Sequence, residues 1–226
     1  GSIRAPVRAV TAAVRQLSSG AGGKLGLEGL ASKVDLSTAR VLIRLDLNVP
    51  LSKDDGTTIT DDTRLRAVVP TMNFLKAQGA SVVIATHIGR PKGEPDPAFS
   101  VQPVLGRLSE LLDTDVRRAD DCVGDDVKNM CTNMPQGGVT LLENVRFHKG
   151  ETKNDKAFAE ALARSSGANA YVNDAFGTAH RAHASTEGVV KFIDGPAAGG
   201  VLMEKELVYI KGAIDDPKRP LTAILG

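Results

Sequence analysis

The chain has 226 residues, of which 42% are hydrophobic, and a formal net charge of +1. This length and composition suit one large globular domain, or a domain with part of another. The near-neutral charge excludes a global basic field for nucleic acid, and the absence of tryptophan argues against base-stacking platforms. Because no apolar stretch approaches the roughly 20 residues that span a bilayer, we expect neither nucleic acid nor a membrane as a partner.

The first 27 residues differ from the rest because they contain no acidic residue; the first acid is Glu28. Their basic residues are Arg4, Arg8, Arg15 and Lys24. An acid-free segment with arginine and serine is typical of an organellar transit peptide. We therefore expect residues 1–27 to be an N-terminal extension and favour the plastid stroma as location. A disordered tail or a tag remnant, with a cytoplasmic protein, is the alternative.

Short apolar, β-branched runs flanked by turn residues recur along the chain and predict strands that are buried on both faces. These runs are residues 40–46, 80–86, 139–142, 169–173 and 221–225. Between them, apolar residues at helical spacing predict helices. These helices are expected at residues 62–78, 101–112, 154–166 and 201–213. The alternation predicts an α/β fold, with a Rossmann-like parallel sheet flanked by helices.

Four of the predicted strands are followed by a basic or polar cluster. The clusters contain Arg44, Asp46 and Asn48; His87 and Arg90; Arg146; and His180, Arg181 and His183. Parallel sheets bind ligands at the carboxyl ends of their strands, so the clusters are expected at one edge. Arginine presents five donors in a fork that fits phosphate or carboxylate. The pattern predicts a site for a small polyanion.

Several sequences resemble, in order and spacing, those of the phosphoglycerate kinase family. They are IRLDLNVP, ITDDTRLRAVVPT, ATHIGRPKG, DDCVG, LLENVRF, NDAFGTAHRAHAS and LMEKEL. The resemblance covers about residues 28–226. The sequences are more similar to those of the bacterial and plastid branch of the family than to those of the animal branch. It implies a two-domain enzyme that transfers a phosphoryl group reversibly between 1,3-bisphosphoglycerate and ADP, giving 3-phosphoglycerate and ATP.

The resemblance also implies roles for individual residues. Arg64 matches the arginine that meets the reacting group and is the one expected catalytic residue. Asp46 and Asn48 match residues that hold the hydroxyl and carboxyl end of the substrate. The expected phosphate-binding residues are His87, Gly89, Arg90, Arg146, His180 and Arg181. Arg44 and His183 are weaker candidates, since Arg44 is expected to pair with an acid and His183 to support the arginine turn.

The resemblance implies that residues 28–198 form the domain that binds 3-phosphoglycerate or 1,3-bisphosphoglycerate. Residues 199–226 would be an interdomain helix and the first strand of the nucleotide domain, which is essentially missing here. Mg²⁺ with ATP or ADP would bind that other domain, so we expect no cofactor in this chain alone. Intact family members are expected to be monomers.

Two other functions are considered. The chain could be an inactive binding or scaffold module in a larger assembly. A dinucleotide-binding Rossmann domain is disfavoured because no GxGxxG follows a predicted strand.

Two cysteines, Cys122 and Cys131, are too few for a disulfide scaffold. We expect two reduced, partly buried thiols. A redox pair or metal binding is the alternative, and no metal ligand is assigned.

Overall fold

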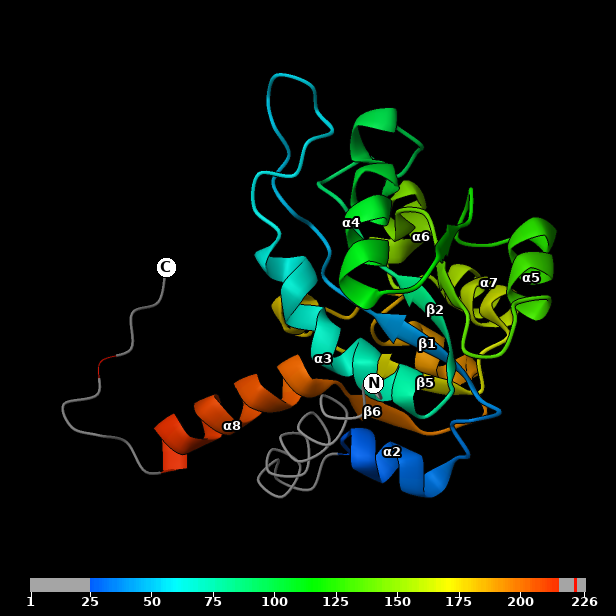
Figure 1. Ribbon diagram of the computed structural model, residues 1–226, viewed down its shortest axis with the longest axis vertical. Helices are drawn as coiled ribbons and strands as arrows, with labels where there is room; N and C mark the ends of the chain where they lie inside the picture. The colour runs from blue at the N-terminus through cyan, green and yellow to red at the C-terminus, as the bar shows by residue number, and fades with distance from the viewer. Residues whose placement is uncertain (1–24, 216–221, 223–226) are drawn as a thin grey trace, which may run out of the picture.

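Six short strands that alternate with helices form one sheet in the computed structural model, which describes residues 25–215 and 222 (Figure 1). The strands are β1 (Arg40–Arg44), β2 (Ser81–Ala85), β3 (Val116–Arg118), β4 (Val139–Leu141), β5 (Ala170–Asn173) and β6 (Ala197–Gly199). They lie in the order β3-β4-β2-β1-β5-β6, and every neighbouring pair is parallel. The predicted parallel α/β sheet is confirmed.

Four predicted strands correspond to β1, β2, β4 and β5, the central strands of the sheet. The two outermost strands were not predicted. β3 has one buried residue, Val116, and β6 consists of two alanines and a glycine. Such segments lack the β-branched run that marks a buried strand. The strand expected at residues 221–225 falls outside the described residues, apart from residue 222.

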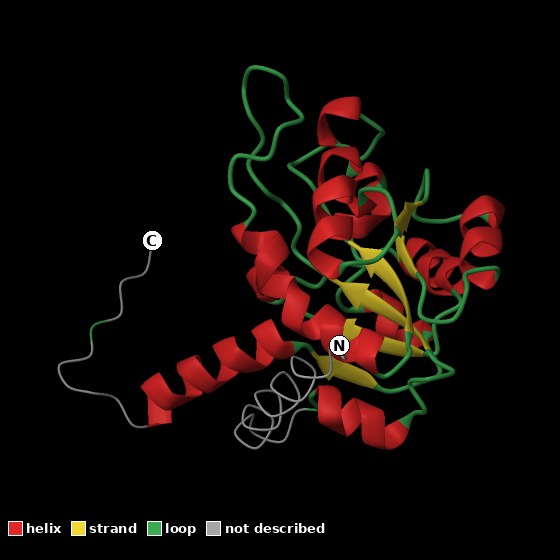
Figure 2. Cartoon of the chain, viewed as in Figure 1, coloured by secondary structure: helices red, strands yellow, loops and turns green. Residues whose placement is uncertain are grey.

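Helices cover both faces of the sheet (Figure 2). They are α2 (Leu27–Lys33), α3 (Thr63–Ala77), α4 (Gln102–Leu112), α5 (Asp125–Thr132), α6 (Lys149–Thr152), α7 (Lys156–Ser166) and α8 (Val201–Asp215). Short 3₁₀ turns are η1 (Pro97–Phe99), η2 (Val145–Phe147), η3 (Phe176–Thr178) and η4 (Gly188–Phe192). The four predicted helices correspond to α3, α4, α7 and α8. The others have eight residues or fewer, too few for a clear helical periodicity.

Successive side chains of the central strands pack alternately into two apolar cores. Val41 and Ile43 of β1 join the core beneath α2, α3 and α4, whereas Leu42 between them joins the core beneath α5 and α7. Val82 and Val83 of β2 divide in the same way. Burial on both faces explains why these strands appear in the sequence as continuous apolar runs.

α2 and α8 are joined to this sheet by buried polar groups. Leu27, which we expected in the N-terminal extension, is fully buried in α2, and its N–H donates to Glu204 Oε1 of α8 at 3.2 Å. The first turn of α8 is held by Asp174, whose Oδ1 accepts from the N–H of Met203 at 3.0 Å. The remainder of α8 extends away from the sheet (Figure 1), and Tyr209 is 67% exposed. Among the described residues, no helix is long and apolar enough to cross a bilayer.

Candidate functional site: the basic edge of the sheet

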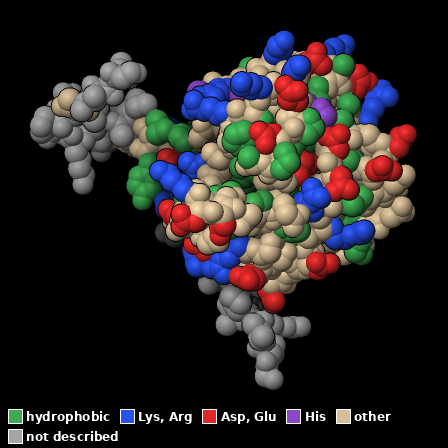
Figure 3. Space-filling model, turned by 90° about the horizontal axis from the view of Figure 1, so that it is seen from above, with side chains coloured by type: hydrophobic (Ala, Val, Ile, Leu, Met, Phe, Trp, Pro, Cys, Tyr) green, Lys and Arg blue, Asp and Glu red, His purple; other side chains and the backbone are tan. Residues whose placement is uncertain are grey.

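The predicted clusters lie together because the four strands they follow are adjacent. β4, β2, β1 and β5 are consecutive in the sheet and all run in the same direction. Their carboxyl ends therefore meet at one edge, where an open α/β sheet binds ligands. We call this region the basic edge; it comprises Arg44, Asp46, Asn48, Arg64, His87, Gly89, Arg90, Arg146, His180, Arg181 and His183. The charge is local: the face in Figure 3 carries both signs, with several Lys and Arg side chains gathered near a histidine along its upper edge.

Arg44, the last residue of β1, lies inside the protein with no solvent exposure. Its Nε donates to Ser185 Oγ at 3.0 Å, a second nitrogen bonds the carbonyl of Leu45, and a third lies 2.9 Å from His87 Nδ1. All three guanidinium nitrogens thus have protein partners. Arg44 supports the site, and its burial favours this structural role over direct ligand contact.

His87 is held as a neutral ring by this arginine. Burial first, and then the positive charge of Arg44, lowers the pKa of His87 to about 2. Because a guanidinium can only donate, Nδ1 of His87 accepts and the ring proton lies on Nε2. The neutral ring can donate one hydrogen bond to an anion.

A buried carboxylate, Glu151, anchors the other end of this network. Glu151 Oε1 and Oε2 accept from the hydroxyl and the N–H of Ser185 at 2.6 and 2.9 Å. His183 Nδ1 lies 3.6 Å from the same carboxylate. Burial raises the pKa of Glu151, but His183, Arg44 and Ser185 together lower it below its usual value. The carboxylate charge offsets that of Arg44, and His183 is placed to support the turn rather than to reach the edge.

Gly89 connects three of the predicted residues. Its N–H donates to Asn48 Oδ1 at 2.8 Å, and its carbonyl accepts from Arg146 at 2.9 Å. Its φ of +59° is in the left-handed region, and a Cβ atom would lie 2.3 Å from the ring of Phe99. A glycine is therefore required by conformation and packing. These reasons are additional to the phosphate-binding role expected for Gly89.

Arg146 is a cation with donors to spare. It is 8% exposed, and its Nε is buried without a hydrogen-bond partner in the described part of the chain. Burial and the positive charges of Arg44, Arg181 and Arg90 lower its pKa, while Glu151 opposes them. Positive charges crowded in this way favour binding of an anion, which would relieve their repulsion.

Arg64 of α3 is paired with Asp46 in the loop after β1. One guanidinium nitrogen lies 3.0 and 2.9 Å from the two carboxylate oxygens, and the arginine side chain is 51% exposed. Asp46 Oδ1 also accepts from the N–H of Asn48 at 3.2 Å. The pair joins Arg64 to the loop after β1, and the remaining nitrogens of the half-exposed guanidinium are available for a ligand.

The remaining residues are exposed. Arg90 follows β2, and His180 and Arg181 follow η3 after β5. Arg181 Nε donates to His180 Nε2 at 3.1 Å. His180 also lines a cavity of about 550 Å³ with Phe176 and Met203 of α8. The structure thus separates a buried group around Arg44 from an exposed group on the turn after β5.

Sequence reasoning missed Glu151 and Ser185, the buried acid and hydroxyl that position Arg44. Ser185 closes the sequence NDAFGTAHRAHAS, which was a usable signal. Glu151 lies in the polar run HKGETKND and appears as an ordinary surface acid. Its burial follows from the position of α6 rather than from a local pattern.

Residues 31–226 match the family model described as Phosphoglycerate kinase. The chain is 54% identical over 211 residues to Phosphoglycerate kinase 1, chloroplastic, of Arabidopsis thaliana, covering 90% of this chain and 43% of that protein. It is 55% identical to the cytosolic Phosphoglycerate kinase of Triticum aestivum, covering 88% of this chain and 48% of that one. The phosphoglycerate kinase structure from Pyrococcus horikoshii is similar with a TM-score of 0.74 and 33% identity, over 87% of this chain and 47% of that one. The chain thus spans less than half the length of these relatives.

Proposed function

Because this chain belongs to the phosphoglycerate kinase family, we propose that its basic edge binds 3-phosphoglycerate or 1,3-bisphosphoglycerate. The observation that carries the proposal is Arg146, a buried cation beside other arginines with an unpartnered Nε. A phosphate dianion would supply the negative charge that these crowded guanidinium groups lack. His87 adds a neutral donor, and Arg90 and Arg181 add exposed guanidinium groups.

The activity proposed for the whole enzyme is phosphoryl transfer between 1,3-bisphosphoglycerate and ADP. Such transfer is catalysed mainly by positioning and by neutralising charge. Arg64 is the proposed catalytic residue, because its half-exposed guanidinium can follow the charge that develops on the transferring group. Asp46 would keep Arg64 in position until substrate binds. In the direction that consumes ATP the nucleophile is the carboxylate of 3-phosphoglycerate, and in the reverse direction it is a terminal phosphate oxygen of ADP. Both are already ionised, so no general base is required.

Mg²⁺-ATP does not fit the residues described. Within residues 25–215 and 222, the grouped candidate ligands for a metal include a thiol and an imidazole, whereas Mg²⁺ prefers oxygen ligands. The sequence also contains no GxxxxGK[ST] phosphate loop. We assign nucleotide binding to the part of the family that this chain does not span. Residues 28–198 are then the substrate domain, and α8 belongs to the proposed connection between domains.

Calorimetric titration with 3-phosphoglycerate tests the site. Arg146→Met keeps similar volume but removes the donors, so affinity should fall about 10- to 100-fold, as expected for lost charge-assisted hydrogen bonds. Because the lost cation is buried among like charges, thermal stability should stay the same or rise. Arg66→Met is the matched control, since Arg66 of α3 pairs with Asp62 and is 60% exposed. Unchanged affinity in Arg146→Met would refute the site.

An inactive binding or scaffold module is the second candidate, since the basic edge could bind an anion without transferring a phosphoryl group. In a full-length protein that includes the nucleotide domain, a coupled assay of ADP formation from 3-phosphoglycerate and ATP separates the two functions. Turnover that is lost in the Arg64→Ala variant and kept in the Arg66→Ala variant would reject the scaffold module. Binding of the acid without turnover would favour it.

Plastid location is proposed from the acid-free residues 1–27, most of which lie outside the described residues. The relatives do not decide it, because they include chloroplastic and cytosolic proteins. Import of a fluorescent fusion of residues 1–27 into isolated chloroplasts would test it.

A further inference from the structure

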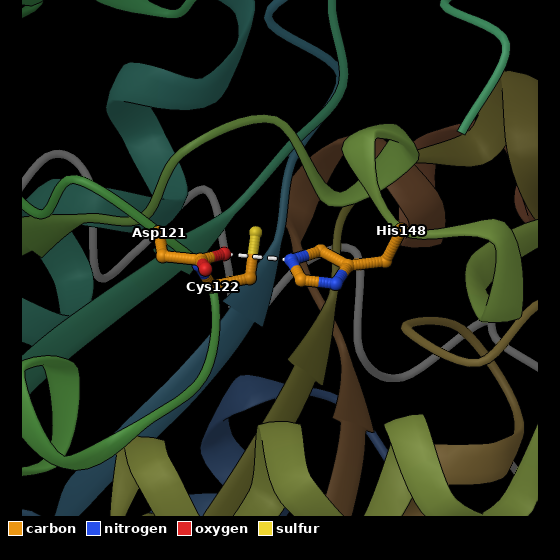
Figure 4. A group of neighbouring side chains, drawn as sticks. All are labelled: Asp121, Cys122 and His148. Carbon is orange, nitrogen blue, oxygen red and sulfur yellow. Dashed lines mark hydrogen bonds and ion pairs between the residues drawn. The ribbon is translucent and has the colours of Figure 1, made fainter. Parts of the chain in front are cut away.

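A second group of reactive side chains lies where β3 and β4 end, and none of them belongs to the basic edge. Asp121 and Cys122 follow β3, and His148 follows η2 after β4 (Figure 4). Because β3 and β4 are parallel neighbours, their carboxyl ends meet at the same edge of the sheet. One ligand atom from each side chain lies within 4.8 Å of the others.

The three side chains are held in this arrangement by their neighbours. His148 Nε2 lies 2.6 Å from Asp121 Oδ1, and the same oxygen accepts from the N–H of Cys122 at 2.6 Å. The His148 ring stacks on Phe158 with ring centroids 4.6 Å apart. Cys122 Sγ donates to the carbonyl of Glu143 at 2.8 Å. Figure 4 shows the Asp121 carboxylate and the His148 imidazole directed toward each other, with the Cys122 sulfur beside them.

A cavity gives access to this group. The cavity has a volume of about 840 Å³, and Asp121 and His148 both line it. Their side chains are 53% and 26% exposed, whereas Cys122 is fully buried. A cation in the cavity would therefore meet the carboxylate and the imidazole, with the thiol behind them.

The charges that line the cavity do not repel a cation. Arg118 is the basic guanidinium in the lining, and it is paired with Glu143 at 2.9 Å and with Asp120 at 2.5 Å. These two carboxylates offset the charge of Arg118. The carboxylate of Asp121 is held instead by the His148 ring.

We propose that Asp121, Cys122 and His148 bind a divalent ion of the zinc class, with its fourth coordination position open to the cavity. Carboxylate oxygen, thiolate sulfur and imidazole nitrogen are all zinc ligands, and three protein ligands with one open position are typical of reactive zinc sites. The sulfur and nitrogen ligands disfavour Mg²⁺ and Ca²⁺. The site does not depend on the proposed binding of 3-phosphoglycerate.

Binding an ion changes the bonding of the Cys122 thiol. Its proton leaves to solvent, and its hydrogen bond to the Glu143 carbonyl is replaced by a metal–sulfur bond.

The movement required of the His148–Asp121 pair is small, and Cys122 Sγ, within 4.8 Å of both ligand atoms, must also approach the ion. Ligands about 2.0 Å from a tetrahedral zinc ion are about 3.3 Å apart, whereas His148 Nε2 and Asp121 Oδ1 are 2.6 Å apart. The pair must open by less than about 1 Å. Rotation of the half-exposed Asp121 side chain provides this, because it faces the cavity.

Titration of the whole chain with Co²⁺ tests the site, because a cobalt–thiolate bond gives a near-ultraviolet charge-transfer band and tetrahedral Co²⁺ absorbs in the visible. We expect one Co²⁺ per chain, displaced by Zn²⁺. Cys122→Ser should lose the charge-transfer band, and Cys131→Ser, the matched control, should keep it. Asp121→Asn and His148→Gln should each weaken binding at least about tenfold. Asp126→Asn, at an exposed carboxylate that does not line the cavity, should not.

Three results would overturn the proposal. They are no charge-transfer band at millimolar Co²⁺, a band that persists in Cys122→Ser, or a band that is lost in Cys131→Ser. Circular dichroism of each metal-free variant shows whether it is folded. Should Cys122→Ser fail to fold, equal affinities of His148→Gln, Asp121→Asn and the unmodified chain would overturn the proposal on their own.

Discussion

Glu204, near the start of α8, is expected to lower the stability of the protein at neutral pH. It is 2% exposed, and its Oε2 is buried without a hydrogen-bond partner among the described residues. Burial, with smaller effects from Asp174 and Glu28, raises its pKa from the usual 4.5 to about 7. The hydrogen bond from the N–H of Leu27 opposes this shift.

The direction in which the free energy of unfolding changes with pH follows from proton binding. A carboxyl group with a higher pKa in the folded state holds more protons there than in the unfolded state. The free energy of unfolding therefore falls as pH rises from about 4.5 to about 7. At about 1.4 kcal/mol per pH unit, the whole range corresponds to about 3 kcal/mol. Local relaxation reduces this, so we expect about 1–3 kcal/mol.

Glu204→Gln tests the prediction because it removes the charge and keeps an oxygen for the N–H of Leu27. At pH 8 the variant should be more stable than the unmodified chain by about 1–3 kcal/mol, and at pH 4 the two should be nearly equal. Urea unfolding followed by circular dichroism at each pH gives both values. Asp174, with a pKa of about 6, titrates in both proteins. Their difference therefore reports the titration of Glu204 together with its coupling to Asp174.

Glu206→Gln is the matched control, because this partly exposed acid lies on the same helix. A Glu204→Gln variant no more stable than the unmodified chain at pH 8 would refute the reasoning. An equal gain from Glu206→Gln would assign the effect to the net charge of α8.

Three further substitutions, the first with a control variant, test the basic edge, its support and the start of α8. Gly89→Ala should destabilise the folded protein by about 2–4 kcal/mol, because of the positive φ at this position and the contact of a Cβ with the ring of Phe99. Gly106→Ala, in open space on α4, should instead stabilise it by about 1 kcal/mol. Thermal unfolding measures both changes. Glu151→Gln should lower stability by about 1–3 kcal/mol and weaken 3-phosphoglycerate binding in the same calorimetric assay, and full retention of both would contradict its role. Thr71→Val should lower the free energy of unfolding by about 1–3 kcal/mol, because the Thr71 hydroxyl links the buried carboxylate of Asp174 to the first turn of α8. Urea unfolding measures this change, and an unchanged free energy of unfolding would show that the link contributes nothing.

The sheet could be predicted to the extent that its strands are buried on both faces. β1 and β2 have near-continuous apolar sequences because helices cover both sides. β3 and β6 are outermost, and their pairing depends on one neighbouring strand rather than on apolar side chains. Their existence is a property of the assembled sheet, which local sequence cannot report.

The basic edge was predictable because a parallel sheet brings its carboxyl ends together, whatever the exact strand order. How deeply each arginine is buried was not predictable from the sequence. Arg44 and Arg146 follow similar apolar runs, yet all guanidinium nitrogens of Arg44 have protein partners, whereas the Arg146 Nε has none in the described part of the chain. The difference depends on Glu151 and Ser185, which come from distant parts of the chain.

The central position of β1 has a consequence for how the chain is made. β1 pairs with β2, about 40 residues later, but its other partner is β5, and the hydrogen bond from Arg40 to Asn169 joins residues 129 apart. During synthesis, one edge of the central strand stays unpaired until most of the chain has emerged from the ribosome. Unpaired edges are templates for pairing with other chains, and distant pairings form slowly. We therefore expect the nascent chain to be most prone to association with other chains before β5 has emerged.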